Sequence, residues 1–500
     1  MAAYSVIAIR PGIQFMQKRL FSILSILIMI SSVVVIRTLL HSPPPFADIT
    51  LVNIDLDEPA MADRLSQAIR FQTISHQSAS DKQNLEFQGF IDWVEVTYPA
   101  VHSKLDRVML GQTILYQWQG SVDHLKPILL TGHYDVVPVI PGSEHKWLHP
   151  PFAGKVVDGD IWGRGALDDK SGVVGILEAV TYLLNDGFQP RRSIYLSFGH
   201  DEEVGGVQGA AAVADYLKKN KVQLAWSLDE GSFLYRDMLP DVNTLVAAIN
   251  VAEKGSITLD IVATAEGGHS SMPPQQNAVS DLAKAITLLH ENPVPGGLDG
   301  LSAEMFDVIS RYMAFPTRLL FANQWLFSQM IEQQLSTSPT TNAMLRTTTA
   351  PTMLSGSIKS NVLPIEAIAT VNFRIHPRDN TTSIEKFVND LVASDSITVR
   401  KRSGINASAV SARKTPAFEQ IGQSMREVYG DIAVSPGLMI AGSDSKHYAK
   451  VADNAYRFNP FILPSADISG FHGSNEKIAV AAFAQGVRGY IQIIRNGSSQ

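Results

Sequence analysis

Hydrophobic and polar positions alternate with two different periods along most of the chain. Short apolar runs at residues 128–130, 193–198 and 224–228 predict strands, and each run ends in a group of polar residues. Between the first two runs, apolar residues recur with helical spacing over residues 173–184, and this pattern stops near Gly187. Strands that alternate with helices are typical of an α/β unit, so we expect a sheet covered by helices.

The pattern changes near Glu253. Strand, helix, strand, strand, helix and strand are then predicted at residues 256–265, 279–290, 352–358, 367–375, 384–392 and 397–402. This β-α-β-β-α-β order is that of a ferredoxin-like α+β plait, interrupted by a mostly helical segment at residues 292–349. From about Pro416 the α/β pattern resumes. The chain therefore divides into residues 1–45 (membrane anchor and linker), 46–252 (first segment of the α/β domain), 253–404 (inserted plait) and 405–500 (second segment of the α/β domain).

The N-terminal region contains an apolar run at residues 20–36, preceded by Lys18 and Arg19 and followed by Arg37. At about 1.5 Å per residue this run is just long enough to cross a bilayer as a transmembrane helix. The basic flank favours a cytoplasmic N-terminus, with the folded body on the periplasmic, extracellular or lumenal side. A cleaved signal peptide is the alternative, but no small-x-small cleavage site follows the run. The proline-rich residues 42–45 then form a short stiff linker.

Composition narrows the range of functions. A chain of 500 residues is too long for one compact core, and its hydrophobic content of 45% and charged content of 18% are typical of a globular protein. The net charge of −7 argues against a nucleic-acid binder, which usually carries a basic face. The chain has no cysteine. Any bound metal must therefore be held by His, Asp and Glu side chains.

Chargeable residues follow all three predicted strands of the first α/β region. His133 and Asp135 follow the first strand, residues 201–203 (Asp-Glu-Glu) follow the second, and Asp229 and Glu230 follow the third. Open α/β sheets bind ligands at the carboxyl ends of their strands, so these side chains are expected to meet at one edge. Adjacent carboxylates are unfavourable unless cations neutralise them, which favours a metal site over a solvated acidic loop.

A glycine-rich approach, residues 160–167, leads Asp168 and Asp169 to the predicted helix start. A plain N-cap explains one of the two carboxylates, whereas a carboxylate that bridges two metals explains the arrangement as a whole. His472 would complete such a set. His145 and His149 have helical i, i+4 spacing, but prolines follow at once, so we interpret them as loop residues.

Several ordered motifs resemble the M20 metallopeptidases, and their spacing is most similar to the subgroup of carboxypeptidase S and the N-acyl-amino-acid hydrolases. The resemblance covers nearly all of residues 58–495. The motifs that carry it are His133-Tyr134-Asp135-Val136-Val137-Pro138, Gly163-Arg164-Gly165-Ala166-Leu167-Asp168-Asp169-Lys170, residues 199–206, Gly268-His269-Ser270-Ser271, Asn361-Val362-Leu363-Pro364, Phe373-Arg374-Ile375-His376-Pro377 and His472-Gly473-Ser474-Asn475-Glu476-Lys477.

The resemblance implies a zinc-dependent exopeptidase-like catalytic domain that holds two Zn²⁺ ions per chain. His133 and Asp229 would hold one ion, Glu203 and His472 the other, and Asp168 would bridge both. The third carboxylate position is ambiguous, because some family members use Asp and others Glu, so Glu230 could replace Asp229.

The remaining roles also follow from the resemblance. Glu202 would be the general base, and Asp135 would orient His133. His269, from the plait domain, would reach an active site, often that of the partner in a homodimer. Asn361 and Arg374 would contact the substrate carboxylate.

The expected reaction is hydrolysis of an amide bond next to a free carboxylate. Glu202 would take a proton from the attacking water and give it to the departing nitrogen. Small peptides of the Gly-Xaa type and N-acyl amino acids both fit, and the sequence does not choose between them. The alternative is a catalytically inactive, membrane-anchored binding protein for small acids or peptides. Such a protein would be expected to have lost Glu202 or a ligand, and all of these positions are filled.

Overall fold

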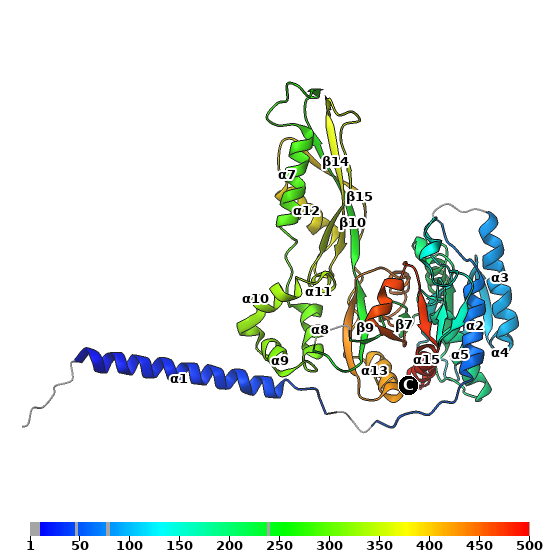
Figure 1. The fold of residues 1–500 in the computed structure, drawn as a ribbon. Helices are drawn as coiled ribbons and strands as arrows, with labels where there is room; N and C mark the ends of the chain where they lie inside the picture. The colour runs from blue at the N-terminus through cyan, green and yellow to red at the C-terminus, as the bar shows by residue number, and fades with distance from the viewer. Residues whose placement is uncertain (1–10, 46–48, 77–80, 238–240, 500) are drawn as a thin grey trace, which may run out of the picture.

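A large mixed sheet forms the centre of the body in this computed structural model, which describes residues 11–45, 49–76, 81–237 and 241–499 (Figure 1). The predicted strands are present at its centre, where β3 pairs in parallel with both β6 and β7. In spatial order the strands are β1 (Asp106–Leu110), β2 (Thr113–Trp118), β6 (Ile194–Gly199), β3 (Ile128–His133), β7 (Trp226–Asp229), β17 (Ala455–Arg457), β9 (Val246–Glu253), β8 (Leu234–Arg236) and β18 (Ile462–Pro464), with β16 (Ala433–Met439) paired to β9.

Helices pack on both faces of this sheet because its central strands are apolar on both sides. In β3, Ile128 and Leu130 point to one face, and Leu129 points to the other. The first face is covered by α2 (Glu58–Arg70), α3 (Asp81–Thr97), α4 (Pro99–Lys104), α5 (Lys170–Asn185), α13 (Pro416–Tyr429) and α15 (Val480–Ser498). The second face is covered by α6 (Ala210–Lys219) and α14 (Ser445–Tyr448).

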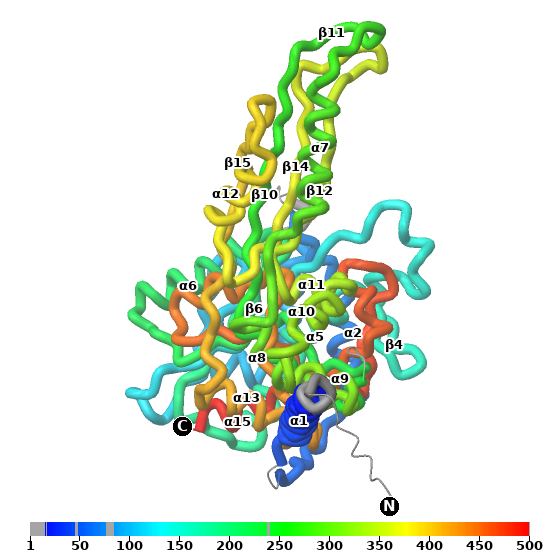
Figure 2. Tube along the Cα trace, turned by 90° about the vertical axis from the view of Figure 1, so that its left-hand side faces the viewer, coloured from blue at the N-terminus to red at the C-terminus, as the bar shows by residue number. Residues whose placement is uncertain are grey.

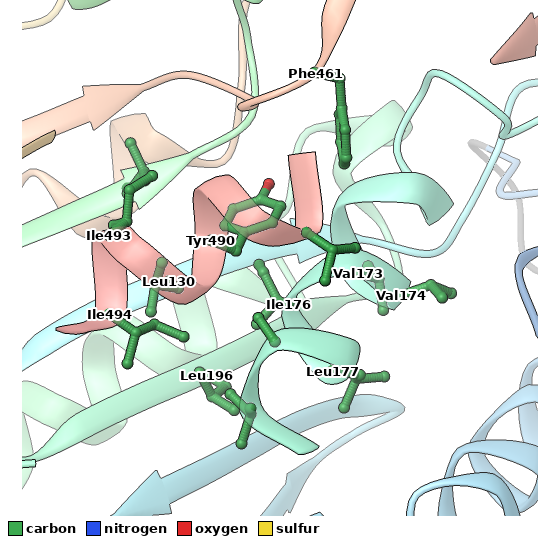
Figure 3. Packing of buried hydrophobic residues seen from close by; sticks show 14 of the residues in the cluster. Leu130, Val173, Val174, Ile176, Leu177, Leu196, Phe461, Tyr490, Ile493 and Ile494 are labelled. Carbon is green, nitrogen blue, oxygen red and sulfur yellow. The ribbon is translucent and has the colours of Figure 1, made fainter. Parts of the chain in front are cut away.

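Helix α5 begins beside the candidate site and is held by the core. Its residues Val173 and Ile176 are fully buried against α15 and the sheet, together with Tyr490 of α15 (Figure 3). Burial of each such side chain contributes about 1.5–3 kcal/mol relative to exposure. The N-terminus of α5, where Asp168 and Asp169 lie, is therefore fixed relative to the carboxyl ends of β3, β6 and β7.

A second sheet, here called the small sheet, rises from the body (Figure 1). Its strands in spatial order are β12 (Thr348–Ser355), β14 (Glu366–Ile375), β10 (Gly255–Thr264) and β15 (Ile397–Ile405), all antiparallel. Helices α7 (Ala278–Glu291) and α12 (Thr381–Leu391) cover one face and share a separate hydrophobic cluster with it. The elements follow one another in the predicted order. Strands β10 and β14 form where the sequence predicts them, because their alternate residues are apolar and face the helices.

The small sheet continues from the large one. Strand β9 ends at Glu253, and β10 begins at Gly255. At the far end of the small sheet, β11 (Gly268–His269) pairs with β13 (Val362–Leu363), a ladder that the sequence pattern did not predict (Figure 2).

The predicted helical interruption consists of α8 (Gly300–Ser310), α9 (Phe315–Ala322), α10 (Gln324–Leu335) and α11 (Pro339–Leu345), with its own hydrophobic cluster. The N-terminal helix α1 (Pro11–Leu40) is longer than the predicted run and packs by its last turns on α9. Elsewhere it stands apart from the body (Figure 1). A third, short sheet of β19 (Lys477–Ala479), β5 (Asp160–Trp162) and β4 (Lys155–Val157) and the 3₁₀ turns η1 (Glu144–Lys146), η2 (Glu202–Val204) and η3 (Ser465–Gly470) complete the described elements.

Candidate metal centre and active site

Asp168 lies between two histidines at the edge where β3 ends. Its Oδ1 is 3.1 Å from His133 Nε2, and its Oδ2 is 3.0 Å from His472 Nε2. The same His472 nitrogen lies 3.2 Å from Glu203 Oε2. These residues come from four separate regions of the chain, so the fold brings together side chains that lie far apart in the sequence. One carboxylate that faces two imidazoles in this way can bridge two cations.

Asp135 holds His133 and the acidic turn in place. It is fully buried, and its Oδ1 lies 3.4 Å from His133 Nδ1. Its two oxygens also accept the backbone N–H groups of Glu202 and Glu203, each at 3.2 Å, and the hydroxyl of Ser75 at 2.7 Å. Because one carboxylate contacts both the imidazole and the η2 turn, Asp135 fixes the orientation of His133 and the position of Glu202 together.

The third carboxylate position is occupied most directly by Glu230. Its Oε1 lies 3.8 Å from His133 Nε2, and its carboxylate, with His133 and Glu202, provides ligand atoms within 4.8 Å of one another. Asp229 is buried one position earlier, at the end of β7, where its Oδ1 accepts the backbone N–H of Glu230. Of the two residues that the sequence left open, the geometry therefore favours Glu230.

The site carries more negative charge than its own side chains neutralise. Burial raises the pKa of Glu202 and Glu230 well above the usual value, and it raises that of Asp229 to about 6. Hydrogen bonds that His472 donates to Asp168 and Glu203 raise its pKa to about 10, because the two carboxylates stabilise the protonated imidazole. A group of buried carboxylates beside two imidazoles is stable at neutral pH when cations compensate the charge.

Unpaired oxygens at the site agree with this requirement. Glu203 Oε1, Asp229 Oδ2 and Asp444 Oδ1 are buried and have no hydrogen-bond partner among the described residues. Buried oxygens normally have a partner, and a cation supplies one. The ligand atoms of His133, Asp168 and Glu203 also lie within 4.8 Å of one another. Nitrogen and oxygen donors of this kind suit Zn²⁺ and similar ions.

The loop that delivers Asp168 is fixed by an ion pair between residues of two different sequence motifs, Arg164 and Glu476. Glu476, fully buried, accepts the backbone N–H groups of Gly165 at 3.0 Å, Leu167 at 2.8 Å and Asp168 at 3.1 Å through its Oε1. Its Oε2 lies 2.6 Å from Nη1 of Arg164, which is also buried. A buried charge needs a partner, but these two residues lie 312 positions apart, so no local pattern in the sequence indicates that they pair.

Asp169 has a separate role from Asp168. It occupies the N-cap position of α5 but makes no side-chain capping hydrogen bond there, and Asn459 donates to its Oδ1 at 3.0 Å. A Cβ at Gly132 would lie 2.5 Å from its Oδ2, so only glycine fits at that point of β3. Asn459, which belongs to none of the sequence motifs, fixes the second aspartate behind the site.

A model of peptidase family M20/M25/M40 matches residues 129–496, which include all the residues of this cluster. The chain belongs to this family. Curated relatives agree with the assignment. A probable carboxypeptidase S-like 2 of Dictyostelium discoideum is 39% identical over 447 residues, covering 88% of this chain and 86% of the relative. The N-fatty-acyl-amino acid synthase/hydrolase PM20D1 of Xenopus tropicalis is 36% identical, covering 88% of this chain and 86% of that protein.

Solved structures share the fold. The metallo-carboxypeptidase Sso-CP2 from Sulfolobus solfataricus superposes with a TM-score of 0.64 at 18% identity, over 88% of this chain and 99% of that chain. Human carnosine dipeptidase 1 gives 0.60 at 16% identity, over 88% of this chain and 96% of that chain. The predicted family and the prediction of a hydrolytic enzyme are therefore confirmed: this M20 protein is a hydrolase of the metallopeptidase and carboxypeptidase type.

Two of the three predicted substrate-binding residues of this M20 protein, His269 and Asn361, lie apart from its candidate metal centre. His269 and Asn361 are exposed at the far end of the small sheet, where the backbone N–H of Ser270 donates to the carbonyl of Asn361 at 3.2 Å (Figure 2). Arg374 is exposed near the end of β14 that joins the body, where it pairs with Ser256 of β10. The fold therefore does not bring His269 and Asn361 to the cluster of their own chain.

His376 is a structural residue. It is buried, its Nε2 lies 3.2 Å from the hydroxyl of Ser302, and its Nδ1 accepts from Arg378 at 3.1 Å. Burial, together with the neighbouring Arg378 and Lys254, lowers the pKa of His376 to about 3, so the ring is neutral at working pH. These contacts favour a structural role for His376 over contact with the substrate.

Proposed function

We propose that the chain is a di-zinc hydrolase that cleaves an amide bond next to a free carboxylate, in peptides or in N-acyl amino acids. The position of Asp168 carries this proposal, because its two oxygens face His133 and His472 at 3.1 Å and 3.0 Å. His133 and Glu230 would hold one ion, and Glu203 and His472 the other, with Asp229 as the alternative to Glu230. Bound zinc would supply a water of lowered pKa and polarise the carbonyl of the substrate.

Glu202 is the proton carrier in this proposal. Burial raises its pKa, so the carboxyl group that has taken a proton from the attacking water retains it until it can protonate the departing nitrogen. Asp135 holds the backbone N–H of Glu202 at 3.2 Å and thereby keeps this side chain facing the ligand cluster. A binding protein without activity would have no need of Glu202, and the convergence of Glu202 with the ligands supports an enzyme.

The choice of substrate follows from the relatives. Two classes of names, carboxypeptidase S-like and N-fatty-acyl-amino acid synthase/hydrolase, occur among proteins of comparable identity. Both classes fit a substrate that ends in a carboxylate, which Arg374 could bind by two parallel hydrogen bonds. We therefore propose a free carboxylate as the common requirement, with the acyl group as the variable portion.

The domain arrangement supports action across a homodimer. We propose that residues 253–404 are an inserted plait domain that acts as a lid and dimerisation domain, while residues 46–252 and 405–500 form the catalytic domain. His269 and Asn361 are exposed at the far end of the small sheet, so a partner subunit could receive them.

We also propose that α1 anchors the body to a membrane, with the catalytic domain outside the cytoplasm. The segment Lys18–Leu40 has a mean hydropathy of 2.5, and only 11% of its most apolar stretch is buried in the structure, whereas a core helix would be mostly buried. A cleaved signal peptide would have no need of tertiary contacts, yet Val34 and Thr38 are buried against the body. These contacts support an anchor that is retained.

One experiment tests the catalytic proposal. Purified full-length chain is assayed with a panel of N-acyl amino acids and Gly-Xaa dipeptides, with and without a chelator, and its zinc content is measured. Glu202→Gln should lower kcat by about 10²–10⁴-fold while zinc remains bound, because it removes the proton carrier and leaves the side-chain volume unchanged. Glu419→Gln, an exposed position on α13, is the matched control and should retain full activity. Near-normal turnover of Glu202→Gln, or activity that resists chelation, would contradict the mechanism.

A further inference from the structure

An exposed apolar surface lies on the helical segment between β10 and β12. Phe315 of α9 and Trp325, Leu326 and Met330 of α10 are 42%, 57%, 49% and 47% exposed. Residues 315–335 contain a single basic residue, Arg318, and a single acidic residue, Glu332. Several large apolar side chains close together on a surface usually mark a contact with a partner or a membrane.

This surface is attached directly to α1. The side-chain amide of Asn323, at the joint of α9 and α10, donates to the carbonyl of Val34 at 3.1 Å and to the hydroxyl of Thr38 at 3.3 Å. Arg37 donates through Nε to the carbonyl of Ala322 at 3.1 Å. Asn323 is fully buried by these contacts. The joint of α9 and α10 is therefore held at the level of residues 34–38 of the anchor helix.

Residues 34–38 of α1 are also where the helix would leave the bilayer. A hydrocarbon core of about 30 Å takes about 20 residues of helix. If the span starts after Lys18 and Arg19, it ends close to Arg37, which contacts α9. Figure 1 shows α9 and α10 beside this last stretch of α1. Tryptophan and arginine are enriched at this depth, because they place an apolar body in the membrane and a polar group in water.

The apolar surface also continues onto α1. Val33, Ile36 and Leu39 in its last turns are 42%, 55% and 60% exposed, like the residues that precede them. A surface that was covered by another protein would have no reason to continue onto a helix with the hydropathy of a membrane span.

We propose that α9 and α10 form a second membrane contact, in which Phe315, Trp325, Leu326 and Met330 enter the interface of the bilayer that α1 crosses. This inference rests on the anchor proposed above. A single helix with a linker would let the body rotate freely above the membrane, whereas this contact fixes one orientation. The catalytic domain is then held beside the lipid surface, where substrates with long acyl chains concentrate.

The absence of cysteine makes this inference directly testable. Single cysteines are placed in the full-length chain at Leu326 and Met330, at Leu27 in the middle of α1, and at Met272 near the far end of the small sheet, where it is 80% exposed. Each is spin-labelled in vesicles of phosphatidylcholine. Collisions with oxygen, which enters the bilayer, are compared with collisions with a nickel chelate, which stays in water. Circular dichroism verifies that each variant is folded, and turnover of a soluble dipeptide is measured separately.

The expected result is a several-fold higher ratio of oxygen to nickel collisions at Leu326 and Met330 than at Met272. If Leu27 is in the bilayer but Leu326 and Met330 match Met272, this inference fails and the anchor stands. If Leu27 itself is exposed to nickel, the anchor proposal fails as well, while dipeptide turnover tests the catalytic proposal separately. Low collision rates with both reagents at Met330 would mean that a second protein copy covers the surface, which also overturns the inference.

Trp325 gives a second measurement without a label. Lipids brominated near the carbonyl region should quench a fraction of the fluorescence of the wild-type chain. This quenching should be largely lost in Trp325→Phe. A tryptophan that is buried in the core, such as Trp226, is out of reach of the brominated lipid and is not quenched. Equal quenching in both chains would contradict the proposed depth of α10.

Discussion

The ion pair of Arg164 and Glu476 should be among the most important single contacts for stability around the site. Glu476 is fully buried and pairs with Arg164 at 2.6 Å, and it accepts three backbone N–H groups of the loop that leads to Asp168. Glu476→Ala leaves the guanidinium buried without a charged partner, although it still donates to the carbonyl of Gly473, and such a loss costs about 3–5 kcal/mol. The freed N–H groups add to this cost unless water enters.

Thermal unfolding of the chain measures this loss. At about 2 °C for each kcal/mol in a large domain, Glu476→Ala should lower Tm by about 6–10 °C. The matched control is Glu304→Ala, which removes a more exposed pair with Arg413 of the same N–O distance, 2.6 Å, and should cost less than about 1 kcal/mol. Turnover should fall with Glu476→Ala as well, because the loop no longer fixes Asp168.

A double-mutant cycle gives the outcome that would refute this reasoning. Arg164→Met combined with Glu476→Gln removes both buried charges. The double variant should therefore lose less unfolding free energy than the sum of the losses in the two single variants. If Glu476→Ala unfolds within about 1 kcal/mol of wild type, or if the two changes are additive, the ion pair does not hold the loop.

Three further predictions concern the metal centre, the dimer and pH. Glu230→Ala should reduce bound zinc, measured by mass spectrometry, more than Asp229→Ala does, and the reverse order would return the ligand role to Asp229. Mixing inactive Glu202→Gln with inactive His269→Ala protein should restore some of the activity, because one site of a mixed dimer then has both groups; no recovery in mixed dimers would place His269 outside catalysis. Burial, together with the nearby Arg374, lowers the pKa of Lys254 from 10.5 to about 7. Between those pH values the unfolded chain binds a proton that the folded chain does not, so stability rises with pH across this window. Lys254→Met should flatten the rise in Tm, and an unchanged slope would contradict this origin.

The sequence by itself determined the order of the elements and the main chemistry. Period-two alternation placed β10 and β14, and helical spacing placed α5 and α7, because the apolar positions of an element record which face is buried. The ends of the elements differ by a few residues, as for β12, predicted at 352–358 and found at Thr348–Ser355. The motifs identified the family. They also indicated which side chains meet, because His133, Asp168 and Glu203 follow strand ends or precede a helix, and these positions lie at one edge of the sheet.

Tertiary structure decided what depends on the direction of side chains and on distant partners. Asp229 and Glu230 are neighbours in the sequence, and only the geometry of the strand end directs Glu230 towards His133. The pairing of Arg164 with Glu476 and of Asp169 with Asn459 joins positions about 300 residues apart, which no local pattern encodes. The contact of Asn323 with α1 is of the same kind. Hydrophobic periodicity specifies which side of an element is buried, but the partner it meets depends on the packing of the whole chain.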